Sequence, residues 1–346
     1  MLIISVLVYR VNCACRARMA LPMTRTDAKL YTDRHTIAQY PLRGQNIKAA
    51  RKLYLSERFI MQETNSSLMA ILGHLLEKRG FNFSGYRLSM LERRIGKRLT
   101  ATHSKDQQSY LLHLQNNPEE LDMLLDAITI NVSNFFRDPL TFELLADRIL
   151  PAIVENKVRL NDNTIRVWSA GCAMGEEPYS VAIIIHELLQ KERIRISPQI
   201  FATDIDGKAL KEAEKAAYKA SSLENVKHRH LTRYFSQSGK AFQLLPEITG
   251  MVTFEQYDML ATRHRVPPVS IFGNFDLILC RNLLIYLNTD CQKTVFTKLH
   301  HALARNGILI LGQAEAPGLN HQQCFSRIVD FSPIYRKCQE KTANEA

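Results

Sequence analysis

The apolar residues of this chain follow two different periodicities along its length. Between about residues 67 and 126 they recur at the three- and four-residue spacing of amphipathic helices. Breaks in the pattern fall at residues 80–85, 100–104 and 116–118, where Gly, Pro and polar residues gather. The pattern predicts a small bundle of about four helices in this region.

From residue 164 onward, short apolar runs alternate with longer amphipathic stretches. The runs predicted as strands are residues 165–170, 199–203, 251–255, 275–280 and 307–311. The stretches predicted as helices are residues 177–190, 207–217 and 289–304. This alternation is typical of an α/β fold with a mainly parallel, doubly wound sheet. Such sheets bind ligands at the carboxyl ends of their strands, so functional residues are expected directly after each strand.

The first predicted strand runs into a segment of mostly small residues, 169–180, that leads directly into a helix. Small residues let the backbone turn tightly and approach a ligand. The segment contains neither a Walker A sequence nor a complete G-x-G-x-x-G. Glu176 and Glu177 at the helix start disfavour a pyrophosphate and favour a positively charged nucleoside. A structural turn whose acids cap the helix is the alternative explanation.

Polar residues also follow the second and fourth strands. Asp204 ends the second strand, where a carboxylate can accept hydrogen bonds from both hydroxyls of a ribose. Asp206 is predicted to cap the next helix. Arg281 and Asn282 follow the apolar run at residues 275–280, where a buried polar pair is costly without a ligand. A ligand contact is favoured for this pair over an incidental loop position.

Two further groups of polar residues lie outside the predicted sheet. Asn131, Ser133 and Arg137 interrupt the apolar segment between bundle and sheet, which a capped linker would explain equally well. The helix around residues 86–99 carries several basic residues and one acid, Glu92; the basic residues are Arg87, Arg93, Arg94, Lys97 and Arg98. With Leu88, Leu91 and Ile95 pointing inward, the basic residues are predicted to form an outward face. That face is either simply solvated or a docking surface for an acidic partner.

The net charge of +11 is distributed unevenly over the 346 residues. Residues 1–66 hold eleven Lys and Arg against four Asp and Glu, so the rest of the chain is close to neutral. The basic balance therefore does not indicate a nucleic-acid partner. The seven cysteines contain no C-x-x-C pair, which argues against a disulfide scaffold or a zinc site and favours a reduced, cytoplasmic setting. No metal site is predicted.

The first residues form a short apolar run, Met1 to Tyr9, that is followed by arginines. A bilayer span needs about 20 apolar residues, and a secretory signal has its basic residues before the apolar run rather than after it. Membrane insertion is therefore not expected. Residues 1–66 are interpreted as a disordered or non-native extension, with Met19, Met23 or Met61 as possible true starts. A weak signal or surface anchor is the alternative.

Six motifs follow one another along the chain with no segment missing between them. They are Leu91-Glu-Arg-Arg-Ile95, Ile130-Asn-x-Ser-x-Phe-Phe-Arg-Asp138, Val167-Trp-Ser-Ala170, Gly175-Glu-Glu-Pro-Tyr-Ser180, Ala202-Thr-Asp-Ile-Asp206 and Cys280-Arg-Asn-x-x-Ile-Tyr286. Together they resemble the CheR family of chemotaxis-receptor methyltransferases. The resemblance covers about residues 67 to 338.

The resemblance implies an α/β fold: a class I, Rossmann-like S-adenosylmethionine-dependent methyltransferase sheet with a small N-terminal all-α domain. The implied activity is protein-glutamate O-methylation. The expected organisation is an extension at residues 1–66, a helical receptor-docking domain at 67–127, a linker at 128–148 that contributes to the cofactor site, a methyltransferase domain at 149–338 and a tail at 339–346.

The resemblance also implies the roles of individual residues. The residues expected to bind S-adenosylmethionine are Asn131, Ser133, Arg137, Glu177, Asp204, Asp258, Met259, Arg281 and Asn282. Ser133 stands where Thr is more usual, and Asp258-Met259 where the family often has Asn-Leu. Arg137 and Tyr286 are expected to be catalytic, near the transferring methyl group, where they would orient the glutamate carboxylate.

The implied partners are the acidic cytoplasmic helices of methyl-accepting chemotaxis receptors, bound by the basic helix face of a monomeric enzyme. Residues 234–243 are short for the hairpin by which some family members bind a receptor's C-terminal pentapeptide, so no such tether is expected. Two alternatives remain: an inactive family member that docks or senses cofactor, and a nucleic-acid methyltransferase. The second lacks support because Arg281-Asn282-Leu283 stands where amino-methylating enzymes carry Asp/Asn-Pro-Pro-Tyr/Phe.

Overall fold

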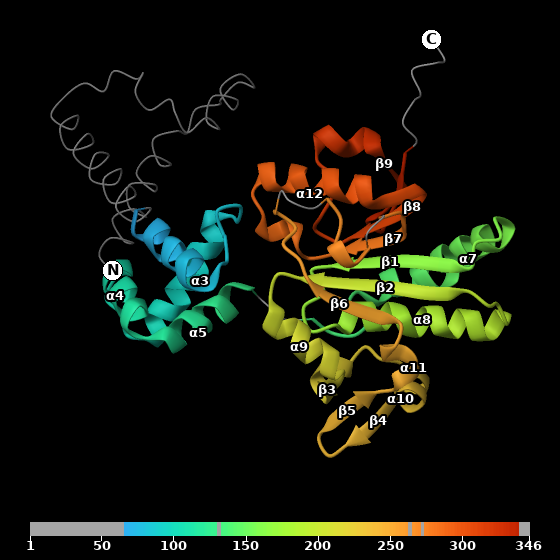
Figure 1. The fold of residues 1–346 in the computed structure, drawn as a ribbon, viewed down its shortest axis with the longest axis horizontal. Helices are drawn as coiled ribbons and strands as arrows, with labels where there is room; N and C mark the ends of the chain where they lie inside the picture. The colour runs from blue at the N-terminus through green and yellow to red at the C-terminus, as the bar shows by residue number, and fades with distance from the viewer. Residues whose placement is uncertain (1–65, 130–132, 262–264, 271–272, 339–346) are drawn as a thin grey trace, which may run out of the picture. The chain divides into compact units, whose positions relative to one another are not determined.

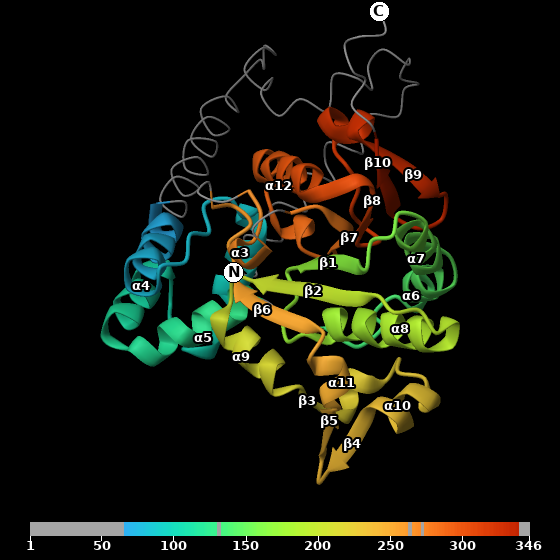
Figure 2. The same ribbon diagram turned by 45° about the vertical axis from the view of Figure 1, so that its right-hand side comes forward.

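The computed structural model describes residues 66–129, 133–261, 265–270 and 273–338 (Figures 1 and 2). These residues belong to one compact unit of the chain, Asn65–Ala346. No helix in this described part is both long enough and apolar enough to span a bilayer.

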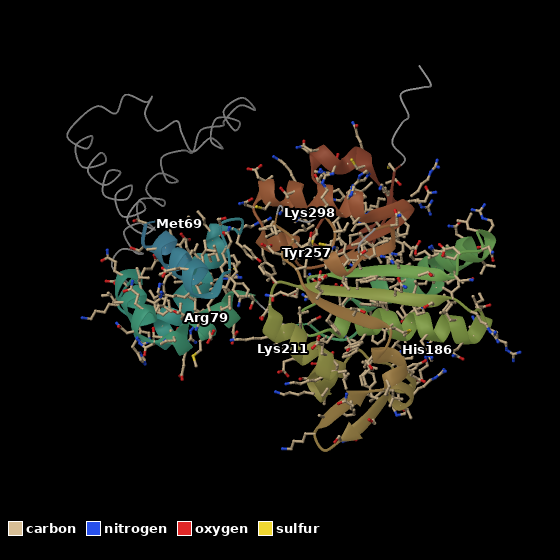
Figure 3. The ribbon with its side chains drawn as sticks, in the orientation of Figure 1. Met69, Arg79, His186, Lys211, Tyr257 and Lys298 are labelled. Carbon is tan, nitrogen blue, oxygen red and sulfur yellow. The ribbon has the colours of Figure 1, made fainter. Side chains whose placement is uncertain are left out.

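The all-α part consists of a helix over residues 66–79, α3 (Leu88–Ala101), α4 (Gln107–Asn116) and α5 (Pro118–Thr129). These are the four helices that the apolar periodicity predicts. Asp106 begins α4 with a capping box, in which its carboxylate accepts the Ser109 N–H at 2.7 Å. Arg79, labelled in Figure 3, donates to the Asp122 carboxylate at 2.8 Å and so ties the first helix to α5.

The core of the bundle is made of apolar side chains from all four helices. Leu91 and Ile95 of α3 are fully buried in it, as predicted. The inward orientation predicted for Leu88 is wrong, because this side chain is 41% exposed. Leu88 is the first residue of α3, and the buried residues of this helix are Met90, Leu91 and Ile95.

The large sheet has seven strands in the order β6-β2-β1-β7-β8-β10-β9. Its strands are β1 (Thr164–Ala170), β2 (Ser197–Asp204), β6 (Val252–Gln256), β7 (Phe275–Cys280), β8 (Leu303–Leu311), β9 (Phe325–Val329) and β10 (Ile334–Lys337). The first five strands in this order pair in parallel, whereas β10 runs antiparallel to both of its neighbours. The mainly parallel, doubly wound sheet is confirmed, and the terminal β9–β10 hairpin is an addition to it.

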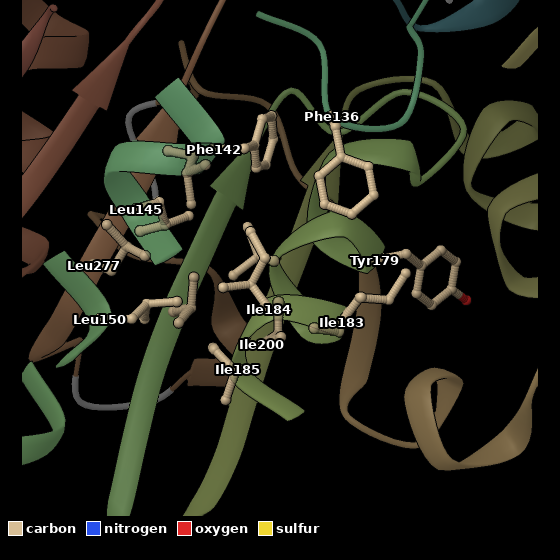
Figure 4. Packing of buried hydrophobic residues seen from close by; sticks show 14 of the residues in the cluster. Phe136, Phe142, Leu145, Leu150, Tyr179, Ile183, Ile184, Ile185, Ile200 and Leu277 are labelled. Carbon is tan, nitrogen blue, oxygen red and sulfur yellow. The ribbon is translucent and has the colours of Figure 1, made fainter. Parts of the chain in front are cut away.

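Helices cover both faces of this sheet (Figure 2). The regular helices around it are α6 (Pro139–Leu144), η3 (Leu145–Ile149, a π-helix), α7 (Leu150–Arg159), α8 (Glu176–Glu192), α9 (Gly207–Lys215) and α12 (Thr289–Ala302). Successive residues of a strand point to opposite faces. Val167 accordingly packs in the cluster under α8, and Trp168 in the cluster under α12. Figure 4 shows the first cluster around Ile184, Ile200 and Leu277.

Several predicted boundaries differ from the observed ones by a few residues, and two of them illustrate the reason. The helix predicted to reach residue 217 ends at Lys215, because Ala216 adopts a left-handed conformation with φ 49° that α-helices exclude. The strand predicted to begin at residue 307 begins at Leu303, immediately after α12 ends at Ala302. Both differences lie at element ends, where apolar periodicity carries the least information.

A small antiparallel sheet with the order β3-β5-β4 lies between α9 and β6 in the chain. Its strands are β3 (Ala217–Lys219), β4 (Phe235–Ser238) and β5 (Ala241–Leu244), and the helices α10 (His228–Tyr234) and α11 (Pro246–Thr249) flank the hairpin. The hairpin β4–β5 occupies the stretch that was noted as short in the sequence. The remaining helical turns are η4 (Ala220–Leu223), η5 (Pro268–Ser270), η6 (Leu284–Tyr286) and η7 (Leu319–Cys324).

Candidate cofactor and active site

Two adjoining cavities, which share Gly171, lie where β1, β2 and β7 end. The polar cavity is lined by Ser133, Arg137, Gly171, Cys172, Ala173, Glu177, Arg281, Asn282 and Tyr286. The apolar cavity is lined by Tyr86, Gly171, Asp204, Ile205, Tyr257, Asp258, Met259, Leu260, Leu283 and Leu287. The structure thus brings the predicted site residues together at one sheet edge, apart from Asn131, which lies outside the described residues.

A larger cavity lies between α6, α8 and α10, away from these strand ends. Phe136, Phe142, Glu187 and His230 are among its lining residues, and none of the predicted site residues lines it. Because the ligand sites of doubly wound sheets are at the carboxyl ends of the strands, the polar and apolar cavities are the candidate site.

The loop after β1 turns sharply at the boundary between the two cavities. The N–H groups of Gly171 and Cys172 both donate to the Thr203 carbonyl, at 2.8 and 3.0 Å. Gly171 has φ 78°, and Gly175, directly before α8, has φ 90°, a conformation that glycine adopts without strain. The tight turn predicted for the small residues is therefore confirmed by the observed backbone.

Asp204 closes this loop from the end of β2. Its carboxylate accepts the N–H groups of Ala173 and Asp206, each at 2.9 Å. Burial raises the pKa of Asp204, and the backbone donors only partly oppose that effect. Asp206 accepts the Lys208 N–H at 2.9 Å and caps α9, as predicted. Asp204 keeps acceptor capacity toward the apolar cavity that it lines, because a carboxylate offers about four lone-pair positions.

Glu177, on the first turn of α8, is part of a buried ionic chain. Its carboxylate accepts the Ser169 hydroxyl at 2.7 Å and pairs with Arg281 at 3.2 Å. Burial raises the pKa of Glu177, although the Arg281 guanidinium acts in the opposite direction. Ser169 and Arg281 therefore hold the Glu177 carboxylate in the wall of the polar cavity.

Arg281 connects Glu177 and Ser169 to the segment that carries Arg137. Its Nη2 donates to the Asp138 carboxylate at 2.6 Å and to the Arg137 carbonyl at 2.8 Å. Phe136 and Asp138, on either side of Arg137, both have positive φ values of 53° and 60°. Such backbone persists only where surrounding contacts fix it. Arg281, with a side chain only 2% exposed, supplies several of those contacts and so positions Arg137.

Glu315 is a buried acid beside the candidate site that the sequence analysis missed. Its buried carboxylate accepts three backbone N–H groups, from Gly312 at 2.8 Å, Asn282 at 2.9 Å and Ile285 at 3.2 Å. These bonds hold the loop after β7, in which Asn282 has φ 58°. An acid shortly after the β8 strand was the available signal, since β8 ends at the same edge of the sheet as β7.

The loop after β6 forms the wall of the apolar cavity, and α12 anchors it. Lys298, labelled with Tyr257 in Figure 3, lies over the Tyr257 ring with Nζ 5.3 Å from the ring centroid. It also donates to the Ala261 carbonyl. Burial lowers the pKa of Lys298. Asp258 accepts the Leu260 N–H at 2.8 Å, which fixes the turn that presents Met259.

The five basic residues around α3 do not form one outward face. Arg87, Arg93 and Lys97 are exposed, and Arg94 is half-buried. The prediction is wrong for Arg98, whose side chain turns inward and pairs with the buried Glu120 at 2.6 Å. Glu120 also accepts the Tyr110 hydroxyl at 2.7 Å, so this contact belongs to the bundle core.

The strand order with its reversed final strand, the tight loop after β1 and the acid after β2 define a class I S-adenosylmethionine-dependent methyltransferase. The family model described as "CheR methyltransferase, SAM binding domain" matches residues 131–330, and "CheR methyltransferase, all-alpha domain" matches residues 67–129. The chain belongs to the CheR methyltransferase family.

Curated relatives agree with this assignment. The chemotaxis protein methyltransferase of Listeria innocua is 30% identical over 236 residues, which cover 68% of this chain and 84% of that protein. Chemotaxis protein methyltransferase 2 of Vibrio cholerae is 30% identical over 257 residues, 73% of this chain and 86% of that protein. A 104.1 kDa protein of Rhodobacter capsulatus is 32% identical over 68% of this chain, which spans only 24% of that relative.

The residues present fit S-adenosylmethionine. Among the described residues, the lining of the apolar cavity includes two carboxylates, Asp204 and Asp258, and no basic side chain, which suits a cationic nucleoside. Met259, Leu260 and Leu283 offer apolar surface for a base. In the polar cavity, Glu177 presents a carboxylate of the kind that accepts an ammonium group. The cofactor of this methyltransferase is S-adenosylmethionine.

Proposed function

We propose that this protein transfers methyl groups from S-adenosylmethionine to glutamate side chains of methyl-accepting chemotaxis receptors, forming glutamate methyl esters. The observation that carries the proposal is the convergence of Arg137 and Tyr286 with Glu177 on one cavity. The names of the curated relatives support the same substrate class. The predicted site residues that the structure describes all line one of the two cavities, so they give no support to an inactive docking or cofactor-sensing protein.

The cofactor supplies a methyl group on a positively charged sulfur. In the proposed complex, Asp204 accepts from the ribose hydroxyls, Asp258 and Met259 flank the base, and Glu177 accepts from the amino group. Asn131, Ser133 and Asn282 complete the cofactor contacts. Arg281 acts mainly by holding Arg137 in place, because Asp138, Glu177 and the Arg137 carbonyl already engage its guanidinium.

The substrate carboxylate needs no general base, since a glutamate with an ordinary pKa near 4.3 is ionised at neutral pH. Catalysis then depends on positioning the two reactants. Arg137 and Tyr286 are proposed to hold the carboxylate by charge-assisted hydrogen bonds and to aim one oxygen at the methyl group. Closure of the cavity by the bound substrate would exclude water from the reacting atoms.

The exposed basic side chains of α3 are proposed to dock the acidic receptor helix. Arg93 and Lys97 carry this role, together with Arg87 just before the helix. Arg94 is proposed to contribute to docking from a half-buried position. Arg98 does not, because it pairs with Glu120 in the bundle core. Each methyl ester removes one negative charge from the receptor, which relieves repulsion within an acidic helical bundle.

We further propose a cytoplasmic monomer with the domain limits 67–127, 128–148 and 149–338, acting on no nucleic acid and without membrane insertion. The four-residue strands of the β4–β5 hairpin offer little edge for a receptor tail, so docking is proposed to be independent of a C-terminal pentapeptide tether. A low-micromolar titration with a receptor tail peptide would contradict this independence.

Incubation with tritiated S-adenosylmethionine and receptor-containing membranes tests the proposed activity. Base-labile label on a receptor is the expected result, because carboxyl methyl esters hydrolyse in base. Label on added nucleic acid would support a nucleic-acid methyltransferase instead. Cofactor binding without transfer to any receptor would support the inactive alternative and overturn the proposal.

A further inference from the structure

Cys324 and Cys338 lie opposite each other at the open end of the β9–β10 hairpin. Lys337 pairs with Phe325 in this hairpin, and the same register makes Cys338 and Cys324 the next pair outward. A backbone hydrogen bond of 2.8 Å from the Cys338 N–H to the Cys324 carbonyl shows that the pairing extends to these two residues. Two cysteines without a recognisable spacing in the sequence are therefore neighbours across two strands.

The register sets the distance between the two residues. Opposite residues that share a backbone hydrogen bond in antiparallel strands have Cα atoms about 5.5 Å apart. A disulfide joins Cα atoms that are about 4.4–6.8 Å apart, so the pair lies within reach of this bond. Opposite side chains also stand on the same face of the sheet. Cys324 directly precedes β9 and Cys338 directly follows β10, so the backbone at both positions can adjust to the bond.

Both thiols of the pair are free and partly exposed. Side chains alternate between the two faces of a strand. The two cysteines share the face of Ser326 and Arg336, whose side chains are both exposed. Cys172 and Cys280, by contrast, are buried. A small oxidant can therefore reach the sulfurs of the hairpin more readily than those of the sheet interior.

We propose that Cys324 and Cys338 are a redox modification site, which a low-molecular-weight disulfide such as glutathione disulfide converts reversibly into a cross-strand disulfide. One cysteine thiolate attacks glutathione disulfide, which forms a mixed disulfide and releases one glutathione. The second thiolate attacks the cysteine sulfur of the mixed disulfide, which forms the Cys324–Cys338 bond and releases the second glutathione. The two protons and two electrons of the cysteine pair are thereby transferred to two glutathione molecules.

The bond fastens the outer edge of the seven-stranded sheet. β9 is the last strand of this sheet and pairs only with β10 (Figure 2). The turn at residues 330–333 joins the two strands at one end, and the disulfide joins them at the other. Closing this ring removes conformational freedom from the unfolded chain and so stabilises the folded hairpin. In a reducing compartment such bonds are transient, so the pair responds to oxidising conditions.

The cysteine pair lies at the opposite end of the sheet from the candidate site. Lys337, next to Cys338, donates from Nζ to the carbonyl of Leu303 at 2.9 Å, at the amino end of β8. The polar and apolar cavities lie at the carboxyl ends of strands that run parallel to β8. Oxidation is therefore expected to change the stability of the protein and not its affinity for S-adenosylhomocysteine. The inference is independent of the proposed substrate.

Peptide mapping of the full chain tests the proposal. The protein is incubated with glutathione disulfide, its remaining thiols are alkylated, and it is digested with trypsin without reduction. Trypsin separates the two cysteines onto residues 306–327 and 338–341. These two peptides are expected to be joined in the mass spectrum and to be released by dithiothreitol. Absence of the joined peptides at excess oxidant, or joining of either peptide to a different cysteine, would overturn the proposal.

Serine variants identify the sulfurs that react. Cys324→Ser and Cys338→Ser are each expected to abolish the joined peptides. Cys291→Ser is the matched control, because Cys291 is another half-buried free cysteine and lies on α12. This variant is expected to form the joined peptides as the wild type does. If Cys291→Ser lost them, exchange through Cys291 would explain the bond, and direct reaction of the pair would be refuted.

Thermal unfolding and calorimetric titration measure the consequence of the bond. The oxidised wild type is expected to unfold about 5 °C above the reduced protein. Cys338→Ser should unfold at the same temperature under both conditions. A wild type that forms the bond without a rise in unfolding temperature would overturn the fastening of the hairpin. Weaker binding of S-adenosylhomocysteine by the oxidised wild type would overturn the separation of the pair from the site.

Discussion

The backbone N–H of Arg87 donates a hydrogen bond of 2.8 Å to the carbonyl oxygen of Tyr286. Arg87 is the N-cap residue of α3, the helix proposed to dock the receptor, and Tyr286 lines the polar cavity. Tyr286 also packs against the apolar core of the bundle. The docking helix and the proposed catalytic tyrosine are therefore joined directly, without an intervening flexible segment.

Arg137→Ala is expected to abolish most methyl transfer while leaving the protein folded. Removal of one positioned donor from an active site typically lowers kcat by about 100-fold. The Arg281 contacts to the Arg137 carbonyl and to Asp138 do not involve the Arg137 side chain, so the backbone of this segment should keep its conformation. Receptor labelling and thermal unfolding check the two halves of this prediction. Near-normal turnover would show that the assigned function of Arg137 is wrong.

Glu315→Gln is expected to lower transfer by about tenfold, because an uncharged amide holds three backbone donors less firmly than a carboxylate does. The Asn282 and Ile285 N–H groups would lose part of their anchor, and the loop that carries Tyr286 would shift. Asp290→Asn is the control, since Asp290 is an acid with an 88% exposed side chain. Equal activity of the two variants would contradict the anchoring role of Glu315.

Charge reversal at Arg93 and Lys97 is expected to weaken receptor engagement and to leave S-adenosylhomocysteine affinity unchanged. Both side chains are exposed, and neither lines the cavities. The effect should shrink as salt concentration rises, because exposed charges are screened over about 10 Å at 0.1 M salt. The labelling rate as a function of receptor concentration is the measurement. An unchanged rate would refute the docking surface.

Arg98→Ala, by contrast, is expected to destabilise the bundle by roughly 3 kcal/mol, because it leaves the buried Glu120 carboxylate without its cation. Burial opposes ionisation of Glu120, but Arg98 and Tyr110 together lower its pKa. Because the folded-state pKa is lowered, this stabilisation is present above the unfolded pKa and is lost as pH falls through the folded one. Denaturant unfolding at neutral and acidic pH tests this. A wild type and variant whose difference in stability persists at low pH would contradict the ionic explanation.

Cofactor affinity is expected to fall as the solution becomes acidic. Burial raises the pKa values of Glu177 and Asp204, so both carboxylates take up protons at higher pH than exposed acids do. A protonated carboxyl is a poorer acceptor for an ammonium or a ribose hydroxyl. Titration with S-adenosylhomocysteine from about pH 8 to about pH 5 measures the change, and Glu177→Gln should flatten it. A pH-independent affinity would show that these carboxylates do not contact the ligand.

The sequence predicted the elements of this fold well because burial repeats within each helix or strand. Leu91, Ile95 and Val167 lie where local periodicity places them. The sequence-based prediction failed where a residue far along the chain determines the orientation of a side chain. Arg98 turns inward because Glu120 lies on a neighbouring helix, and no pattern within α3 reveals that partner.

The residues of the candidate site likewise divide into those that the sequence predicts and those that it does not. Asp204, Glu177 and Arg281 follow strands, and parallel strand ends gather at one edge, so their convergence was predictable. Tyr86 comes from a turn between helices, and its place in the cavity depends on the backbone pairing of residues 85–87 with residues 286–288. Pairing between such distant backbone segments leaves no periodic trace in either one.

The backbone pairing of residues 85–87 with residues 286–288 limits how this protein can be divided or recombined. A sheet domain separated from residues 83–88 would lose one wall of its apolar cavity together with the backbone partners of Tyr286, Leu287 and Asn288. The helical and sheet domains therefore differ in topology but line one cavity together.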